Sequence, residues 1–157
     1  MPLAEGDKAP DFTVPTDGGG MVSLAGLKGG QVVLYFYPKD DTPGCTKEAC
    51  AFRDALPDFS AADARIVGVS KDTAAKHDRF KAKYDLPFTL ASDTDGSVCE
   101  AYGVWVQKKL YGREYMGIER ATFLIGADGR VKKIWRNVKV PGHAEAVLEA
   151  AREAAGA

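Results

Sequence analysis

Short apolar runs alternate with amphipathic stretches along most of the chain, and this order predicts its secondary structure. Two runs, 31–37 and 65–70, are typical of strands buried on both faces, and 87–91 is predicted as a third strand. The apolar spacing between and after them is helical. It predicts helices from Cys45 onward, from Asp72 or Thr73 to about Tyr84, over 93–102 and over 143–153. Pro57 is expected to kink or end the first helix, because proline has no N–H to donate.

Two hairpins are predicted near the ends of the chain. A turn at 16–20 joins two strand-like runs within 11–24, and Ala127-Asp128-Gly129 joins 121–126 to 131–135. Strands alternating with helices, then a closing hairpin and helix, indicate an α/β layer fold. We expect a thioredoxin-like fold in which helices flank a central mixed sheet, with an N-terminal β-hairpin. Right-handed crossovers would place 38–45 at the carboxyl edge of a central strand, where such sheets bind ligands.

Composition is that of an ordinary globular protein. The chain has 157 residues, of which 45% are hydrophobic and 27% charged, so we expect one domain over 1–157. Its net charge of -1 gives no basic excess to attract nucleic acid or an acidic membrane. A basic cluster near the last hairpin is interleaved with apolar residues, which is typical of a strand with one solvated face: Arg130, Lys132, Lys133, Arg136 and Lys139.

The sequence shows no membrane span, no secretory signal and no zinc-ligand pattern. The longest apolar run, 32–37, is far shorter than the roughly 20 residues of a membrane span. No basic segment followed by an apolar one marks a secretory signal, so we expect a soluble, cytoplasmic protein. The three cysteines and two histidines are too scattered for a four-ligand zinc site. We therefore expect no metal and no cofactor.

Cys45 follows a strand and a polar turn and opens a helix. Free N–H groups and the helix dipole favour an anion at that position, and a thiolate is such an anion. The alternative is an inert cysteine packed as a small apolar residue. Cys50 lies five residues later, which on an ideal helix separates the two Cα atoms by about 8.7 Å. Disulfides need less than about 7 Å, so this pair would form one only if the helix unwinds locally. Otherwise the two are unrelated cysteines.

The segment FYPKDDTPGCTKEAC resembles the active-site segment of the Q-type peroxiredoxins, also called the bacterioferritin comigratory protein family. The family pattern Pro-x-x-x-Thr/Ser-x-x-Cys falls on Pro38, Thr42 and Cys45. The Q-type resolving cysteine falls on Cys50, and IERATFLI places Arg120 where the family has its active-site arginine. The resemblance extends over nearly the whole chain.

This resemblance implies a thiol peroxidase that reduces hydrogen peroxide and alkyl hydroperoxides. Cys45 would be the nucleophile, Thr42 would contact the peroxide through its hydroxyl, and Pro38 would limit the access of water. Arg120 would stabilise the thiolate and polarise the peroxide, a task that suits a fixed charge with forked donors. Backbone N–H groups near Gly44 would add dipoles that need no reorganisation.

The resemblance also implies how the cycle closes. Cys45 sulfenic acid would condense with Cys50, and thioredoxin or a similar dithiol would reduce the resulting disulfide. Glu48 would hold Arg120, the alternative being a solvated carboxylate favoured by the helix dipole. Cys99 is expected to pack in the core and is the reserve candidate for the resolving residue. Relatives of this type are often monomers, and a monomer is expected here.

Two other functions remain open from the sequence alone. A general disulfide oxidoreductase would normally use C-x-x-C rather than the spacing found here. A metal-carrying chaperone would use Cys45, Cys50 and His143, but gives no purpose to the proline and threonine of the loop. His143 otherwise caps or starts the last helix, and His77 is expected to be structural. Two lysines and two tyrosines within 108–115 would line either the site or a surface for the reductant.

Overall fold

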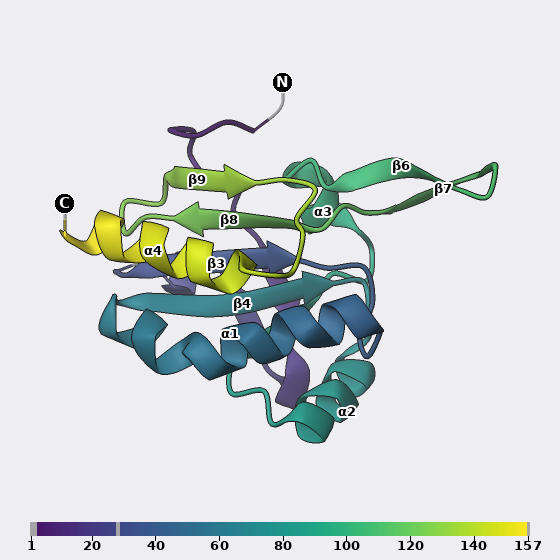
Figure 1. Cartoon of the computed structure of the whole chain (residues 1–157), viewed down its shortest axis with the longest axis horizontal. Coiled ribbons are helices and arrows are strands. Elements are labelled where there is room, and N and C mark those ends of the chain that lie inside the picture. The colour runs from purple at the N-terminus through teal and green to yellow at the C-terminus, as the bar shows by residue number, and fades with distance from the viewer. Residues whose placement is uncertain (1–2, 28, 157) are drawn as a thin grey trace.

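The computed structural model describes residues 3–27 and 29–156, and Figure 1 shows the order of their helices and strands. In chain order these are β1 (Thr13–Pro15), η1 (Asp17–Gly19), β2 (Met21–Ser23), η2 (Ala25–Leu27), β3 (Gln31–Phe36), α1 (Pro43–Ala61), β4 (Ala64–Ser70), α2 (Ala74–Tyr84), β5 (Thr89–Ser92), α3 (Ser97–Ala101), β6 (Trp105–Leu110), β7 (Arg113–Ile118), β8 (Ala121–Ile125), β9 (Val131–Trp135) and α4 (His143–Gly156).

The central sheet has five strands in the order β5-β4-β3-β8-β9. The strands β3, β4 and β5 are parallel, whereas β8 runs antiparallel to both β3 and β9. The predicted mixed sheet and the N-terminal hairpin of β1 and β2 are therefore confirmed. The loop after β3 leaves the middle of the sheet at its carboxyl edge, where the predicted active-site segment begins.

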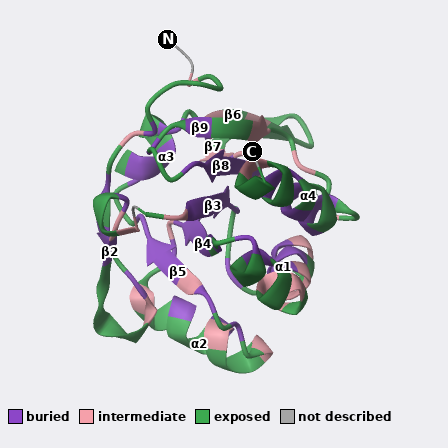
Figure 2. Ribbon diagram, turned by 90° about the vertical axis from the view of Figure 1, so that its left-hand side faces the viewer, coloured by how far each residue is buried: buried purple, intermediate pink, exposed green. Residues whose placement is uncertain are grey.

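Helices and loops cover both faces of this sheet. Figure 2 shows α1 and α4 together on one face, α3 and the β1–β2 hairpin on the other, and α2 below β5. All six residues of β3 are buried, and successive side chains enter opposite layers because a strand has a period of two. Val33 and Tyr35 join the core under α1 and α4, while Leu34 and Phe36 join the core on the opposite face.

Gly68 makes room for an aromatic ring under the middle of α1. It pairs with Tyr35 in the register of β3 and β4. A Cβ atom on Gly68 would lie 2.8 Å from Cζ of Tyr35, which is closer than van der Waals contact allows. The Tyr35 ring stacks on Phe52 of α1 with 4.8 Å between the ring centroids. A glycine in β4 thus lets α1 approach the sheet closely.

The first long helix corrects one sequence prediction. We expected a kink or an end at Pro57, and of these the end is wrong, because α1 continues through this residue to Ala61. Phe59, two residues later, is fully buried and lies 5.8 Å from the ring of Phe52. Burial of this side chain offsets the hydrogen bond that Pro57 cannot donate. The helix also begins at Pro43, earlier than predicted, because proline is well tolerated in a first turn.

The hairpin of β6 and β7 was not predicted, and it projects from the body of the protein (Figure 1). Most of its side chains are exposed, so the alternation of apolar and polar residues that marks a half-buried strand is weak. Its turn residues Tyr111 and Gly112 have φ values of 51° and 77°. Positive φ at both central positions is what a two-residue hairpin turn requires. The Tyr-Gly pair was the feature of the sequence from which this hairpin turn could have been predicted.

The remaining differences concern the ends of elements. The helix predicted over 93–102 is limited to α3, and the Asp93 carboxylate stays outside it, accepting hydrogen bonds from the N–H groups of Val98 and Cys99. Thr73 caps α2 as expected, accepting from the N–H of Lys76 at 3.3 Å. No helix within 3–27 and 29–156 is both long and apolar enough to cross a membrane.

His143, the first residue of α4, predicts a pH dependence of stability. Its Nε2 lies 2.8 Å from Oγ1 of Thr122, and burial, together with the nearby charge of Arg120, lowers its pKa to about 4. The unfolded chain therefore takes up this proton first as the pH falls. We expect His143 to contribute stability above pH 6.5 that is lost between pH 6.5 and about 4.

The measurement is the free energy of unfolding in urea at several pH values, for the wild type and for His143→Gln. Glutamine keeps a side chain that can pair with Thr122 but does not titrate. The wild type should lose more stability than the variant as the pH falls through this window. Parallel curves for the two proteins would show that His143 is not held neutral by the fold.

Candidate active site

Cys45 lies in the first turn of α1, just after the loop that leaves β3. The residue is only 1% exposed and belongs to the core under α1 and α4. N–H groups in the first turn of a helix have no carbonyl partner within that helix, and they point toward this end. Thr42 precedes the helix, and its hydroxyl donates to the carbonyl of Lys39 at 2.9 Å instead of capping the helix.

Arg120 reaches this cysteine from a distant part of the chain, 75 residues further along. It lies between β7 and β8, next to the strand that pairs with β3. Its Nη2 donates to Sγ of Cys45 at 3.3 Å, and its Nη1 donates to Oε1 of Glu48 at 2.7 Å. The structure thus brings together the three residues that the sequence predicted to act as a group.

The charges of this group stabilise one another in a partly dry environment. Burial raises the pKa of Glu48 to about 7, although the adjacent Arg120 partly offsets that rise. Burial also opposes the charge of Arg120, but Glu48 and Cys45 outweigh it and raise the arginine's pKa. The guanidinium therefore stays cationic while it donates to the sulfur, and a positive donor at this distance favours a thiolate.

Gly44 gives the guanidinium its space. A Cβ atom at this position would lie 3.1 Å from Nη2 of Arg120, the same nitrogen that donates to Cys45. A side chain here would push the guanidinium away from the sulfur. The glycine ahead of the cysteine therefore has a steric role besides the N–H group that the sequence assigned to it.

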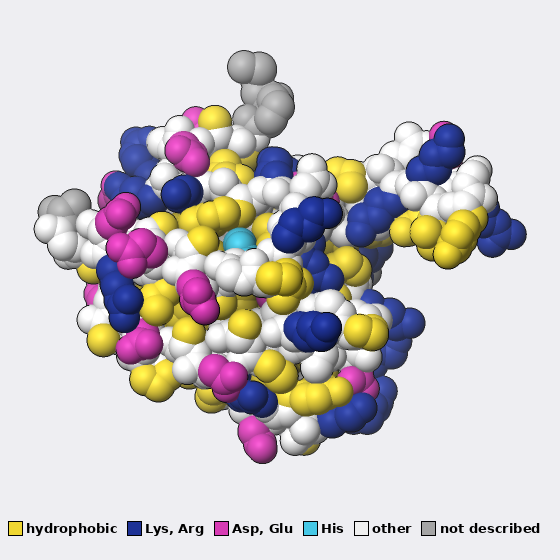
Figure 3. Space-filling view, viewed as in Figure 1, with side chains coloured by type: hydrophobic (Ala, Val, Ile, Leu, Met, Phe, Trp, Pro, Cys, Tyr) yellow, Lys and Arg dark blue, Asp and Glu magenta, His cyan; other side chains and the backbone are white. Residues whose placement is uncertain are grey.

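The projecting hairpin brings a second cation toward the site. Burial, and then the positive charge of Arg120, lower the pKa of Lys108 in β6, which also lies within electrostatic reach of Cys45. The sequence left open whether Lys108 lines the site or a surface for the reductant, and in the structure its charge lies within electrostatic reach of Arg120 and Cys45. Figure 3 shows basic and apolar side chains side by side on this hairpin. Its exposed apolar residues are Leu110, Tyr111, Tyr115 and Met116.

The other two cysteines occupy different surroundings. Cys50 is half-buried on α1 and Cys99 is buried on α3, and all three cysteines are free. Cys45 and Cys50 both lie within α1, so the helix must unwind before their sulfurs can bond. Cys99 belongs to the core on the opposite face of the sheet from Cys45, and burial followed by Asp93 raises its pKa. It packs as the sequence predicted.

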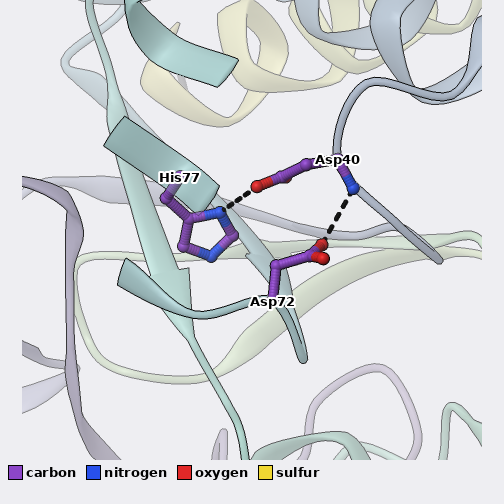
Figure 4. Close-up of side chains that lie close together, drawn as sticks. All are labelled: Asp40, Asp72 and His77. Carbon is purple, nitrogen blue, oxygen red and sulfur yellow. Dashed lines mark hydrogen bonds and ion pairs between the residues drawn. The ribbon is translucent and has the colours of Figure 1, made fainter. Parts of the chain in front are cut away.

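Side chains of metal-ligating types lie close together at one place outside the group formed by Cys45, Glu48 and Arg120 in the described part of the chain. Within the described part of the chain, only Asp40, Asp72 and His77 come close enough together to be compared with a three-ligand metal site. Figure 4 shows that they are hydrogen-bonded to one another and to the backbone. The ligand set of the alternative chaperone function, Cys45 with Cys50 and His143, is not assembled. Pro38 is exposed where the chain leaves β3.

A cysteine in the first turn of a helix, faced by an arginine on a thioredoxin-like sheet, defines the class of thiol-dependent peroxidases. The AhpC/TSA family model matches residues 5–134. The putative peroxiredoxin bcp of Coxiella burnetii is 56% identical, over 94% of this chain and 98% of that protein. Peroxiredoxin Bcp of Bacillus subtilis is 50% identical, over 98% of each chain.

Solved structures show the same relationship. Peroxiredoxin Q of Xanthomonas campestris superposes with a TM-score of 0.90 and 44% identity, covering 98% of this chain and 97% of that one. AhpC of Mycobacterium tuberculosis superposes with a TM-score of 0.79 at 23% identity, which is a likeness of fold. The chain belongs to the AhpC/TSA family and, within it, to the Q-type peroxiredoxins, and it is a thiol-dependent peroxidase.

Glu48 predicts a feature of the pH profile. It ionises near pH 7, and the ionised carboxylate holds Arg120 more firmly than the neutral acid does. We expect kcat/KM for peroxide to show a step near pH 7 that Glu48→Gln lacks. Above this pH the variant should be slower by about tenfold, the effect of weakening one charged hydrogen bond.

Initial rates of peroxide consumption between pH 5.5 and about 8.5 test this, a range that brackets the pKa of the carboxyl group on both sides. Lys47→Gln, which changes an exposed neighbour on α1, is the control and should keep the wild-type profile. Persistence of the step in Glu48→Gln would assign it to another group.

Proposed function

We propose that Cys45 is the peroxidatic nucleophile and that its substrates are hydrogen peroxide and alkyl hydroperoxides. The observation that carries this proposal is the fork of Arg120, with one nitrogen 3.3 Å from Sγ of Cys45 and the other fixed by Glu48. The thiolate attacks one peroxide oxygen, so that an S–O bond forms and the O–O bond breaks. The second oxygen leaves with a proton as water or an alcohol, and Cys45 becomes a sulfenic acid.

The surroundings of Cys45 supply the groups that this step needs. Arg120 and the free N–H groups around Gly44 face the oxygen on which negative charge develops. Cys45 itself is buried, and the partly exposed neighbours Thr42, Gly44 and Arg120 mark the side from which a peroxide approaches. The Thr42 hydroxyl would exchange its bond to the Lys39 carbonyl for one to the substrate. Pro38 would limit the entry of water beside it.

An organic substrate is supported by the surface beside the site. The β6–β7 hairpin carries exposed apolar side chains next to Lys108, and an alkyl group would be shielded from water there. One solved structure of the Xanthomonas campestris bacterioferritin comigratory protein, which superposes with a TM-score of 0.90, bears on the alkyl peroxide reduction activity of that protein.

Cys50 is proposed as the resolving residue. After the first turns of α1 unwind, its sulfur attacks the Cys45 sulfenic acid, an S–S bond forms and water leaves. Cys50 is half-buried on the same helix, whereas Cys99 lies across the sheet. Thioredoxin or another dithiol would then reduce the Cys45–Cys50 disulfide by thiol–disulfide exchange and would itself be oxidised to a disulfide.

The setting of this reaction is also proposed. Three free cysteines without a disulfide framework suit a reducing compartment, which supports the cytoplasm. The five-stranded sheet and the layers on both its faces support one domain over residues 1–157. A monomer without metal or cofactor is the simplest form that carries this chemistry, because the proposed residues all come from one chain.

The first test replaces the nucleophile. Cys45→Ser should abolish peroxide consumption coupled to thioredoxin and its reductase, because a serine hydroxyl is neither ionised nor nucleophilic enough at neutral pH. Cys99→Ser should retain wild-type turnover, since this residue lies in the opposite core. Undiminished activity of Cys45→Ser would refute the assignment.

The second test separates attack from resolution. Cys50→Ser should still react with the first equivalent of peroxide, but its Cys45 should accumulate added oxygen when peroxide is in excess. Mass spectrometry of the peptide that contains Cys45 gives the readout. If Cys50→Ser turns over normally with thioredoxin while Cys99→Ser does not, the resolving residue is Cys99.

A further inference from the structure

A buried polar network outside the catalytic group holds the loop that precedes Cys45. Asp40 lies in this loop, and its Oδ2 is 2.6 Å from Nδ1 of His77 on α2. Oη of Tyr37 donates to the other carboxylate oxygen of Asp40 at 2.5 Å. The backbone N–H of Asp40 donates to Oδ2 of Asp72 at 2.8 Å, and Ser70 donates to the same oxygen at 2.7 Å. Figure 4 shows how the loop residue is held from two sides.

The hydrogen-bond partners define how protons are shared in this network. Nε2 of His77 lies 3.1 Å from the carbonyl oxygen of Ala91 in β5, which can only accept, so Nε2 carries a proton. The other ring nitrogen, Nδ1, faces the carboxyl group of Asp40. The ring nitrogens of His77 are thus both engaged within the protein. The contacts of Asp40 and His77 in this cluster are thus hydrogen bonds within the protein.

The network connects the active-site loop to three other elements of the fold. His77 is fully buried on α2, Ala91 lies in β5 and Asp72 follows β4. Asp40 is therefore hydrogen-bonded to α2 and to the residue after β4, and through His77 to β5. The next loop residue, Asp41, makes only exposed contacts, 2.9 Å to Nζ of Lys83 and 2.9 Å to Oη of Tyr84. Exposed pairs of this kind contribute little. The firm attachment of the loop is at Asp40.

This attachment opposes the movement that disulfide formation requires. Cys45 and Cys50 meet only when the start of α1 unwinds, and the loop at 38–42 runs directly into that first turn. The peroxide reaction requires the opposite, because Arg120 faces Cys45 only while the first turn is formed. Any interaction that exists only in the folded loop shifts the balance between the two states.

We propose that Asp40 and His77 are positioning residues that set the balance between the folded loop, which attacks peroxide, and the unwound loop, which forms the disulfide. This rests on the proposed roles of Cys45 and Cys50. The pair touches neither substrate nor sulfur. Its hydrogen bonds slow disulfide formation and prolong the lifetime of the sulfenic acid, so the pair also sets how readily Cys45 becomes over-oxidised.

The experiment compares two steps in Asp40→Ala and Asp40→Asn. Asp40→Ala removes the tie, and Asp40 borders a surface cavity of about 320 Å³, so water can hydrate the groups left behind. Asparagine keeps every hydrogen bond, because its amide donates to Nδ1 of neutral His77 while its oxygen accepts from Tyr37. Stopped-flow kinetics would measure attack on peroxide and disulfide closure separately.

We expect disulfide closure to be about tenfold faster in Asp40→Ala, while the rate constant for peroxide attack falls by a smaller factor or stays the same. Over-oxidation of Cys45 at a fixed excess of peroxide should fall accordingly. Amide hydrogen exchange within 38–50 should be faster in the dithiol form. Asp40→Asn should resemble the wild type in all three measurements.

Leu86→Ala is the control for general loss of stability. Leu86 is buried beside α2 but has no part in the network, so this variant should lose stability without a change in the ratio of the two rates. His77→Asn, which keeps a donor toward Asp40, is a second conservative variant should Asp40→Ala fold poorly, with His77→Leu as its disrupted counterpart.

The proposal is overturned if both rates in Asp40→Ala and His77→Leu stay at wild-type values, or if they fall together as in Leu86→Ala. Failure of the proposed function is a separate result, because it would appear as undiminished activity in Cys45→Ser. A protein that needs Cys45 and Cys50 but is indifferent to Asp40 and His77 would contradict the present inference alone.

Discussion

The guanidinium of Arg120, shared between the sulfur of Cys45 and the carboxylate of Glu48, is the interaction on which the site depends. A buried thiolate needs a cation that cannot lose its proton, and a buried cation needs a second anion to hold it in place. The fold supplies the sulfur and the carboxyl group from one turn of α1 and the guanidinium from the residue that precedes β8. Gly44 and Gly68 allow the close approaches, one at the guanidinium and one at the ring beneath α1.

In the proposed cycle, the same arrangement favours one step and opposes the other. A formed first turn of α1 keeps the sulfur beside Arg120, and it also keeps the sulfurs of Cys45 and Cys50 apart. In the proposed cycle, one helix end is therefore ordered for peroxide attack and unwound for disulfide formation. The ordered form is supported from outside the helix by the hydrogen bonds that join the loop residue Asp40 to Asp72, after β4, and to His77 on α2. Reactivity and resolution thus draw on different interactions.

The sheet also determines which cysteines can cooperate. Successive residues of β3 enter two separate cores, and Cys45 and Cys99 lie in different ones. Five hydrogen-bonded strands separate the two layers, and no local unwinding of α1 would carry its sulfurs through them. The projecting β6–β7 hairpin, by contrast, adds little to either core, and its Lys108 lies within electrostatic reach of Cys45.

The local sequence pattern was sufficient to predict the elements that are marked by a run of buried apolar residues, a turn sequence or a helix cap. The apolar run of β3, the turn chemistry of both predicted hairpins and the cap at Thr73 each act over a few residues, and all were predictable. The position of Cys45 at a helix start follows from the same local rules. The role of Arg120 came from the family resemblance, because a single arginine before a strand carries no signal of its own.

Only the tertiary structure decided what depends on contacts between distant segments. Pro57 stays inside α1 because Phe59 is buried elsewhere in the core, and β6–β7 forms with few buried side chains to mark it. His77 meets Asp40 across 37 residues, a pairing without periodicity along the chain. Local sequence specifies where the backbone turns and which face is apolar. It does not specify which buried polar groups share a proton, since that requires the layers to be packed.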